Sequence, residues 1–291
     1  MKKLIEGFGI AESPRFHSRW GFLFSDMTGG GVRSFTMAAD VTTVIPHRRA
    51  IGGVLVHAAG GLVVTGRSVT WRRGSHLADR LDLLERREDE EFFNDAWADE
   101  QGRIYVGSLC RADQTGSRPP GRLYRLSLDG SVEVLAEDVL ISNGIGGSPD
   151  GRAIYHADTG ASVIWQYRSD DRDSLHRSEF CDLRDEDGSP DGLAVAADGT
   201  VWVAMADGGA VLQIDPQGRP TGVLRVPQAL VTATCFGGED RRTLVITTGT
   251  QSDRGDESGS VYVDAVAVPG LAQHEARVRG RRARPGTVES T

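Results

Sequence analysis

Apolar and polar residues alternate along most of this chain in short runs that turn signals separate. Strict alternation over a few residues is typical of strands that bury one face, and many such runs indicate an all-β protein. One segment, residues 75–92, fits either a helix or an edge strand followed by an acidic loop. No long amphipathic stretch with helix caps stands out elsewhere. The pattern therefore predicts an all-β fold.

The strand pattern also repeats. Each repeat opens with an acidic or amide residue, reaches a turn glycine and enters an apolar strand. Three segments align without gaps: NDAWADEQGRIYVGS from Asn94, NGIGGSPDGRAIYHA from Asn143 and DGLAVAADGTVWVAM from Asp191. A fourth copy starts at Glu12, and weaker copies start at His57 and Thr232. A period of about 40 to 50 residues with several strands per unit is typical of a β-propeller.

A propeller explains why the repeat is needed, because a lone four-stranded blade cannot bury both of its faces. We therefore expect a six-bladed β-propeller of four-stranded blades over residues 1–271. The ring would close by pairing residues 260–268 with an N-terminal strand at residues 3–9. Residues 272–291 are polar and arginine-rich without an apolar period, which predicts a flexible C-terminal tail.

The repeat predicts where the chemistry lies. The first strand of every blade lines the central channel, so equivalent residues of different blades meet near its axis. The residues at this position in four units all carry side-chain oxygen: Glu12, Asn94, Asn143 and Asp191. Two carboxylates forced together repel, and a divalent cation removes that repulsion. Oxygen ligands of this kind suit Ca²⁺, Mg²⁺ or Mn²⁺, and Zn²⁺ also accepts carboxylate oxygen.

A simpler interpretation applies to most other acidic residues. Asp and Asn often begin strands because their side chains bond to nearby backbone groups. Asp198-Gly199 lies between two alternating runs and suits a tight hairpin, whereas Asp191-Gly192 precedes its strand. We expect turn or structural roles for Asp26, Asp95, Asp99, Asp150, Asp158 and Asp198. His57 occupies a repeat position and is a candidate for lining the pocket.

Composition excludes several classes of function. The net charge of −8 and the pI near 5.4 leave no basic field for nucleic acid. No apolar run is long enough to span a bilayer, and the N-terminus does not resemble a signal peptide. The three widely spaced cysteines form neither a metal motif nor a disulfide framework. We expect a cytoplasmic monomer or weak homo-oligomer that binds a small molecule and neither nucleic acid nor membrane.

The motifs ESPRF, FNDAWADEQGRIYVGS, SNGIGGSPDGRAIYHADT, PDGLAVAADGTVWVA and TCFGGEDRRTLVIT together resemble the regucalcin/gluconolactonase family, in its order and spacing over roughly residues 5–270. The resemblance implies one divalent ion held by Glu12, Asn143 and Asp191, with Asn94 close to the metal and touching substrate. It also implies hydrolysis of lactones, with Asp191 as metal ligand and as general base or proton shuttle.

Two positions depart from the sugar lactonases of that family. Phe92 stands where an Arg commonly precedes the FND motif, and Arg111 stands where an acidic pair is common. An Arg-to-Phe change removes hydrogen-bond donors and adds apolar surface. We therefore expect a partly apolar, anionic substrate rather than a typical sugar-acid lactone. Two alternatives remain: a non-hydrolytic isomerase or cyclase using the same metal, and a non-catalytic metal- or ligand-binding propeller.

Overall fold

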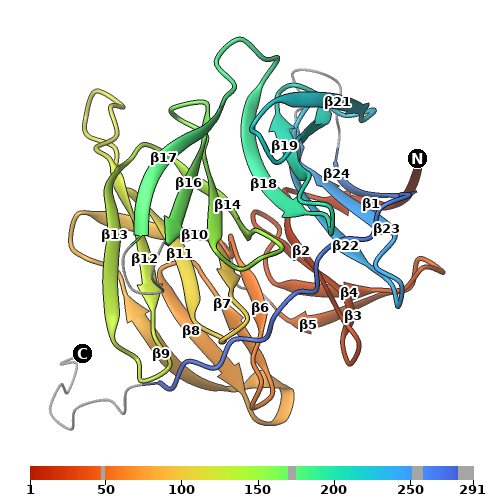
Figure 1. The fold of residues 1–291 in the computed structure, drawn as a ribbon. Helices are drawn as coiled ribbons and strands as arrows, with labels where there is room; N and C mark the ends of the chain where they lie inside the picture. Colours follow the sequence, from red (N-terminus) through yellow and green to blue (C-terminus); the bar gives the residue numbers. More distant parts are fainter. Residues whose placement is uncertain (47–49, 170–174, 251–257, 281–291) are drawn as a thin grey trace, which may run out of the picture.

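The computed structural model describes residues 1–46, 50–169, 175–250 and 258–280. Six antiparallel four-stranded sheets are arranged as the blades of a propeller around one channel (Figure 1). The predicted six-bladed, all-β architecture is confirmed. One short 3₁₀ turn, η1 (Ser75–Leu77), interrupts the β-structure of the described part of the chain.

The inner strands touch one another in sequence around the ring, and the last inner strand contacts the first. They are β2 (Ala11–His17), β6 (Val54–Val56), β10 (Glu90–Ala98), β14 (Ser142–Gly147), β18 (Ser189–Val195) and β22 (Val231–Gly237). Each begins at one end of the channel and runs toward the other, because every unit repeats the same hairpin order. Equivalent residues of the repeats are therefore brought to the same depth in the channel.

The remaining strands build each blade outward by antiparallel pairing. The second strands are β3 (Gly21–Asp26), β7 (Leu62–Val64), β11 (Ile104–Cys110), β15 (Ala153–Asp158), β19 (Val201–Ala206) and β23 (Thr243–Thr248). The third strands are β4 (Val32–Phe35), β8 (Ser68–Arg73), β12 (Gly121–Leu126), β16 (Val163–Ser169), β20 (Ala210–Ile214) and β24 (Gly259–Ala265). The outer strands are β5 (Val41–Ile45), β9 (Asp79–Glu85), β13 (Val132–Val139), β17 (Leu175–Asp182), β21 (Pro220–Arg225) and β1 (Lys2–Phe8).

The ring closes as the sequence predicted. The N-terminal strand β1 pairs antiparallel with β24, so the sixth blade combines both ends of the propeller domain. The ambiguous segment 75–92 resolves into η1, the outer strand β9 and the start of β10. LDLLE is thus an edge strand, because its leucines cover the neighbouring blade while its charged residues face solvent.

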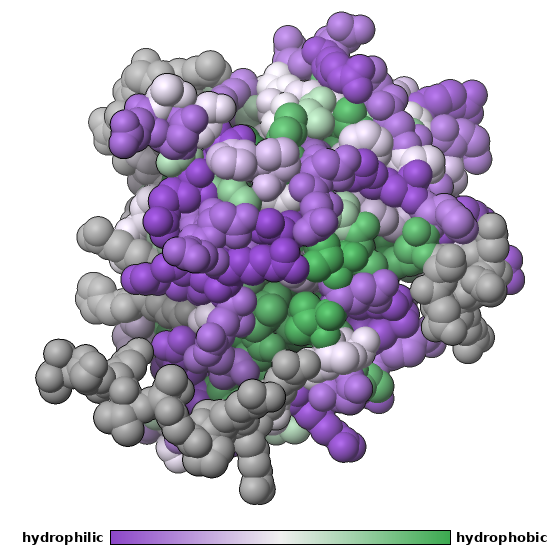
Figure 2. Space-filling model, turned by 90° about the vertical axis from the view of Figure 1, so that its left-hand side faces the viewer, coloured by the Kyte–Doolittle hydropathy of each residue, from purple (hydrophilic) through white to green (hydrophobic). Residues whose placement is uncertain are grey.

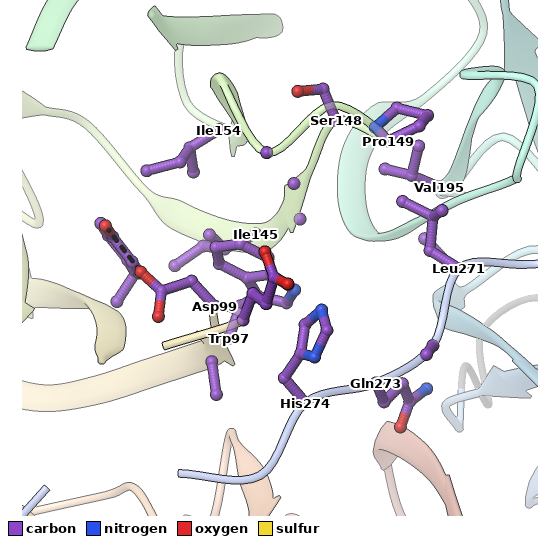
Figure 3. Close-up of a pocket in the computed structure, with 18 of the residues that line it drawn as sticks. Trp97, Asp99, Ile145, Ser148, Pro149, Ile154, Val195, Leu271, Gln273 and His274 are labelled. Carbon is purple, nitrogen blue, oxygen red and sulfur yellow. Dashed lines mark hydrogen bonds between the residues drawn. The ribbon is translucent and has the colours of Figure 1, made fainter. Parts of the chain in front are cut away.

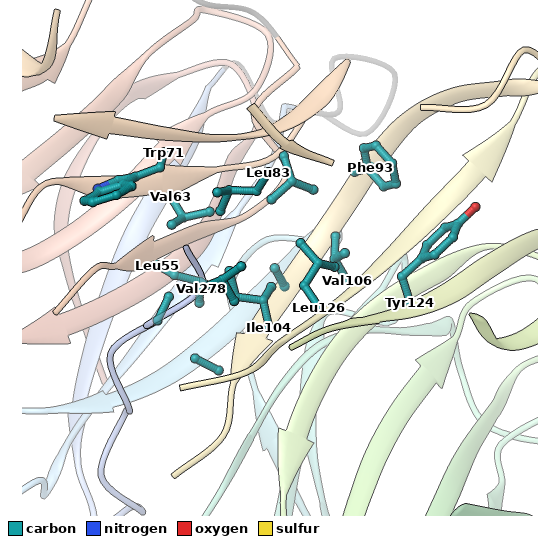
Figure 4. Close-up of a cluster of buried hydrophobic side chains, with 14 residues drawn as sticks. Leu55, Val63, Trp71, Leu83, Phe93, Ile104, Val106, Tyr124, Leu126 and Val278 are labelled. Atoms are coloured by element: carbon teal, nitrogen blue, oxygen red, sulfur yellow. The ribbon is translucent and has the colours of Figure 1, made fainter. Parts of the chain in front are cut away.

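Apolar side chains fill the space between neighbouring blades. One such cluster lies between blades 2 and 3 and contains Trp71, Phe93 and Tyr124 (Figure 4). All three cysteines are buried and none forms a disulfide, as the sequence predicted. In the described part of the chain, no helix is long and apolar enough to cross a membrane.

The outer strands are much more exposed than the inner ones, as β13 and β17 show. The face in Figure 2 is accordingly mostly hydrophilic, with a hydrophobic area near its centre. This gradient from buried inner strands to polar outer strands concentrates buried polar groups along the channel, where a ligand site can form.

The chain continues past β24 as a strap, defined here as residues 266–280, that crosses the end of the channel where the inner strands finish (dark blue in Figure 1). The backbone of Ala276 bridges that of His57, and Arg277 N donates to Gly102 O at 2.8 Å. Ala276 and Val278 are fully buried. We expected a flexible tail from residue 272, but residues 272–280 are packed on the propeller, and 281–291 lie outside the described residues.

Candidate active site at one end of the channel

The four oxygen-bearing repeat residues lie at the end of the channel where the inner strands begin. In five of the six inner strands, the pairing with the second strand shifts register at this level. The shifts bracket Asn94, Asn143, Asp191 and Thr232, whereas Glu12 pairs with Ser25 at the edge of its shift. A β-bulge leaves residues unpaired and re-aims their side chains, so these five blades each place a polar residue at this level.

The two asparagines are held in a fixed orientation. Asn94 Nδ2 donates to Asn143 Oδ1 at 2.7 Å and to Ser142 O at 2.9 Å. Asn143 Nδ2 donates to Thr159 Oγ1 at 2.8 Å, and Thr159 Oγ1 donates to Pro190 O at 2.7 Å. This chain of bonds links blades 3, 4 and 5. Because both N–H groups of Asn94 are engaged, its Oδ1 is left free to accept from a ligand or to bind a cation.

Both carboxyl groups of the cluster have raised pKa values. Burial is the main cause that raises the pKa of Glu12 well above its usual value, and the charges of Asp191 and Asp95 add to it. Burial and Asp95 likewise raise the pKa of Asp191 well above its usual value. Asp191 is only 6% exposed, and its buried Oδ1 has no hydrogen-bond partner among the described residues.

These features fit a divalent cation. An unpartnered buried carboxylate oxygen is costly, and a bound cation satisfies it while relieving the repulsion between Glu12 and Asp191. The donors are two carboxylates and two amides; no group of three or more His, Cys, Asp or Glu side chains suited to a metal occurs in the described ranges. Such an oxygen-only set suits a hard cation such as Ca²⁺ or Mg²⁺.

Two further residues complete the ring of six equivalent positions. Gly52 precedes β6 and lies against Asn94: a Cβ at Gly52 would come within 2.4 Å of Asn94 Oδ1. Thr232 of β22 is buried and donates to Ala11 O. The sequence marks Thr232 only as the start of a weak copy. Gly52 carries no signal in the sequence, because a glycine has no side chain that could be recognised as a ligand.

Beneath the cluster, one ion pair spans the channel. Arg15 Nη2 of blade 1 lies 3.0 Å from Asp95 Oδ1 of blade 3 and donates to Ala96 O at 2.7 Å. We expected only local backbone bonding for Asp95. It does accept from Ala96 N, but its main partner is Arg15. The expectation was incomplete because a contact across the ring has no signature in local sequence.

The other three predicted substrate-binding residues differ in their place relative to the cluster. Phe92 precedes it on β10 and pairs with Leu109. Arg111 follows β11 at the same end of the propeller and is exposed. His57 lies at the opposite end, where it stacks on Trp71 and its Nε2 is 3.1 Å from Val278 O of the strap. The structure therefore does not bring His57 to the cluster.

A cavity of about 1150 Å³ lies at the far end of the channel (Figure 3). The ends of the inner strands line it, together with Gln273 and His274 of the strap. None of the four cluster residues lines this cavity. Arg15 does, so the Arg15–Asp95 pair lies between the cluster and the cavity.

The remaining acidic residues have the structural roles expected. Asp26 and Asp158 each accept hydrogen bonds from backbone N–H groups of neighbouring loops. Asp99, Asp150 and Asp198 accept from backbone N–H groups within their turns. The contrast between Asp191 and Asp198 follows from position, since Asp198 lies in an exposed hairpin and Asp191 in a buried bulge.

Comparison with known proteins gives one family. Residues 10–250 match the profile described as the SMP-30/Gluconolactonase/LRE-like region. A 6-deoxy-6-sulfogluconolactonase of Pseudomonas putida is 35% identical over 74% of this chain and 76% of its own. A regucalcin of Xenopus laevis is 29% identical over 92% of this chain and 94% of its own.

Solved structures share the fold. A luciferin-regenerating enzyme superposes with a TM-score of 0.85 over 95% of this chain and 99% of its own, at 20% identity. The calcium-binding protein regucalcin from Agrobacterium tumefaciens superposes with a TM-score of 0.77 over 94% of both chains, at 19% identity.

Proposed function

Because the chain belongs to the SMP-30/gluconolactonase/LRE-like family, we propose that it hydrolyses lactones or related carboxylic esters with the help of one divalent cation. The observation that carries the proposal is the buried Oδ1 of Asp191, which has no hydrogen-bond partner in the described part of the chain and lies beside Glu12 and the hydrogen-bonded asparagines. The curated relatives named as lactonases, including a pentonolactonase of Haloferax volcanii that is 33% identical over 64% of this chain, support the reaction class.

The four residues of the cluster have different roles in the proposed reaction. Glu12, Asn143 and Asp191 hold the cation, which when bound supplies a Lewis acid that polarises the lactone carbonyl. Asn94 orients the substrate through its free Oδ1, since its amide group is fixed by Asn143 and Ser142. Preorganised groups of this kind cost no rearrangement during the reaction.

Asp191 also moves the proton. A water oxygen forms the new bond to the acyl carbon while Asp191 accepts the proton that this water loses. The ring C–O bond then breaks, and Asp191 returns the proton to the departing alkoxide oxygen. Asp191 is buried, which keeps this proton transfer away from bulk solvent.

We further propose that the substrate carries an apolar part and an anionic group. Phe92 offers apolar surface where sugar lactonases of the family commonly carry Arg. Arg111 is exposed, and its side chain has no hydrogen bond or ion pair with another described residue, which leaves it available to an anion. Gluconolactone belongs in any substrate panel, because one relative is named for a sulfonated gluconolactone.

The test measures hydrolysis of a panel of sugar-acid, alkyl, aryl and anionic lactones through the protons that are released. The protein is first treated with a chelator, and Ca²⁺, Mg²⁺, Mn²⁺ or Zn²⁺ is then added back. Metal-dependent proton release establishes the hydrolase. Product formation without base uptake points to non-hydrolytic chemistry, and no turnover with any metal contradicts the proposal. Efficient gluconolactone hydrolysis with no gain for anionic or apolar lactones contradicts the roles of Phe92 and Arg111.

A further inference from the structure

Arg15 is a largely buried, positively charged residue next to the carboxylate cluster, and it forms an ion pair across the channel. It lies three residues after Glu12 on β2, and its side chain reaches blade 3. Its side chain is 12% exposed, and that of its partner Asp95 is 9% exposed. Nη1 donates to Pro14 O at 3.0 Å, so the guanidinium is held from two blades. A pair this well buried interacts strongly, because little solvent screens it.

Three carboxylates converge at this end of the channel: Glu12, Asp95 and Asp191. The charge of Asp95 acts on both of the others, and it raises the pKa of each. Asp207 also acts on Asp191, but it is exposed in the β19–β20 turn, where solvent screens it. Arg15 compensates one of the three charges. The two that remain, on Glu12 and Asp191, equal the charge of one divalent cation.

We propose that Arg15 sets the charge selectivity of the metal site: by cancelling Asp95, it makes the site match divalent rather than trivalent cations. This inference rests on the proposed function only in that the cation binds at Glu12, Asn143 and Asp191. Arg15 touches neither ligand nor substrate, so it acts as a specificity-determining residue through its charge.

The geometry separates this role from coordination. The guanidinium donates to Asp95 Oδ1 and to two backbone carbonyls, and it also lines the cavity on the far side of the cluster. It therefore lies between the cluster and the cavity and is not one of the residues that would hold the ion. A change of its charge alters the potential at the ion without removing a ligand, and the effect scales with the charge of the ion bound.

The test measures Ca²⁺ and Tb³⁺ binding to metal-free protein by calorimetry. Tb³⁺ is close to Ca²⁺ in size and takes the same oxygen ligands, so the ratio of the two dissociation constants reports charge preference. Four proteins form a cycle: wild type, Arg15→Gln, Asp95→Asn and the double variant. We expect Arg15→Gln to raise the preference for Tb³⁺ about tenfold and Asp95→Asn to lower it by a similar factor. The double variant, whose charge is restored, should return close to wild type.

The outcomes separate this inference from the proposed function. An unchanged preference in Arg15→Gln, as would follow if Asp95 simply took up a proton, overturns the inference while the metal site stands. Wild-type protein that binds neither ion overturns both. If Arg15→Gln does not fold, the ratios in Asp95→Asn and in the double variant still decide: a double variant that keeps the preference of Asp95→Asn contradicts the role of Arg15.

Discussion

Gly52 offers a sharp test of how the ring of repeat positions is built, because it supplies space rather than a ligand. A methyl group at this position would lie 2.4 Å from Asn94 Oδ1 and 2.9 Å from Asn94 Cα. The second contact is with backbone, so rotation of a side chain cannot relieve it. Overpacking of this kind costs about 1–3 kcal/mol of stability. Asn94 must move, and with it the bond from its Nδ2 to Asn143.

We therefore expect Gly52→Ala to lower kcat/KM for the best lactone by about 10- to 100-fold, since a shift near 1 Å can cost that much. The matched control is Gly222→Ala on the exposed strand β21, where the nearest atoms are the flexible end of Gln213 at 3.2 Å. Steady-state kinetics and thermal unfolding of both variants give the answer. A folded Gly52→Ala protein with kcat/KM within twofold of wild type refutes the placement of Asn94 against blade 2.

Two other predictions concern stability. Val278→Ala in the fully buried part of the strap should lower the free energy of unfolding by about 2 kcal/mol. The control Val223→Ala, at a side chain that is 50% exposed, should change it little. Equal effects of the two variants in chemical denaturation would show that the strap does not pack on the propeller. The pKa values of Glu12 and Asp191 are raised in the folded, metal-free protein, so their protonated forms stabilise it at pH below about 4. This contribution is lost as the pH rises through the pKa values of the two groups in the folded state. Because a cation needs both groups ionised, the increase in Tm on adding Ca²⁺ should grow from about pH 5 to 8, and an increase that shrinks would contradict the site.

The fold could be predicted from the sequence because every blade of a propeller repeats the same local pattern of strands and turns. Alternating strands, turn glycines and a period near 50 residues predict blades. Blades in turn place Glu12, Asn94, Asn143 and Asp191 at one depth of the channel. The prediction of a cluster needed only the repeat register, and the inner strand of each of these four blades has a register shift at or next to the residue concerned.

Contacts across the ring could not be predicted in the same way. Arg15 and Asp95 belong to blades 1 and 3, and their pairing depends on the width of the channel rather than on local pattern. The expectation for His57 is wrong because His57 follows the short inner strand β6, in the turn that leads to β7, rather than lying at the start of that strand as Asn143 and Asp191 do in their blades. The strap lacks an apolar period, yet Ala276 and Val278 are buried in the cluster between blades 2 and 3, and backbone hydrogen bonds tie the strap to the propeller.

Lactone hydrolysis by Asp191→Asn and Asp198→Asn tests the central claim most directly. Both aspartates precede a glycine on the same blade, but only Asp191 is buried with an oxygen that lacks a hydrogen-bond partner among the residues that the structure describes. Proton release would be followed with each variant after chelation and after re-addition of the activating metal. We expect Asp198→Asn to retain metal-dependent turnover close to wild type and Asp191→Asn to lose it by about 100-fold or more. Equal turnover by the two variants would contradict the assignment of the active site.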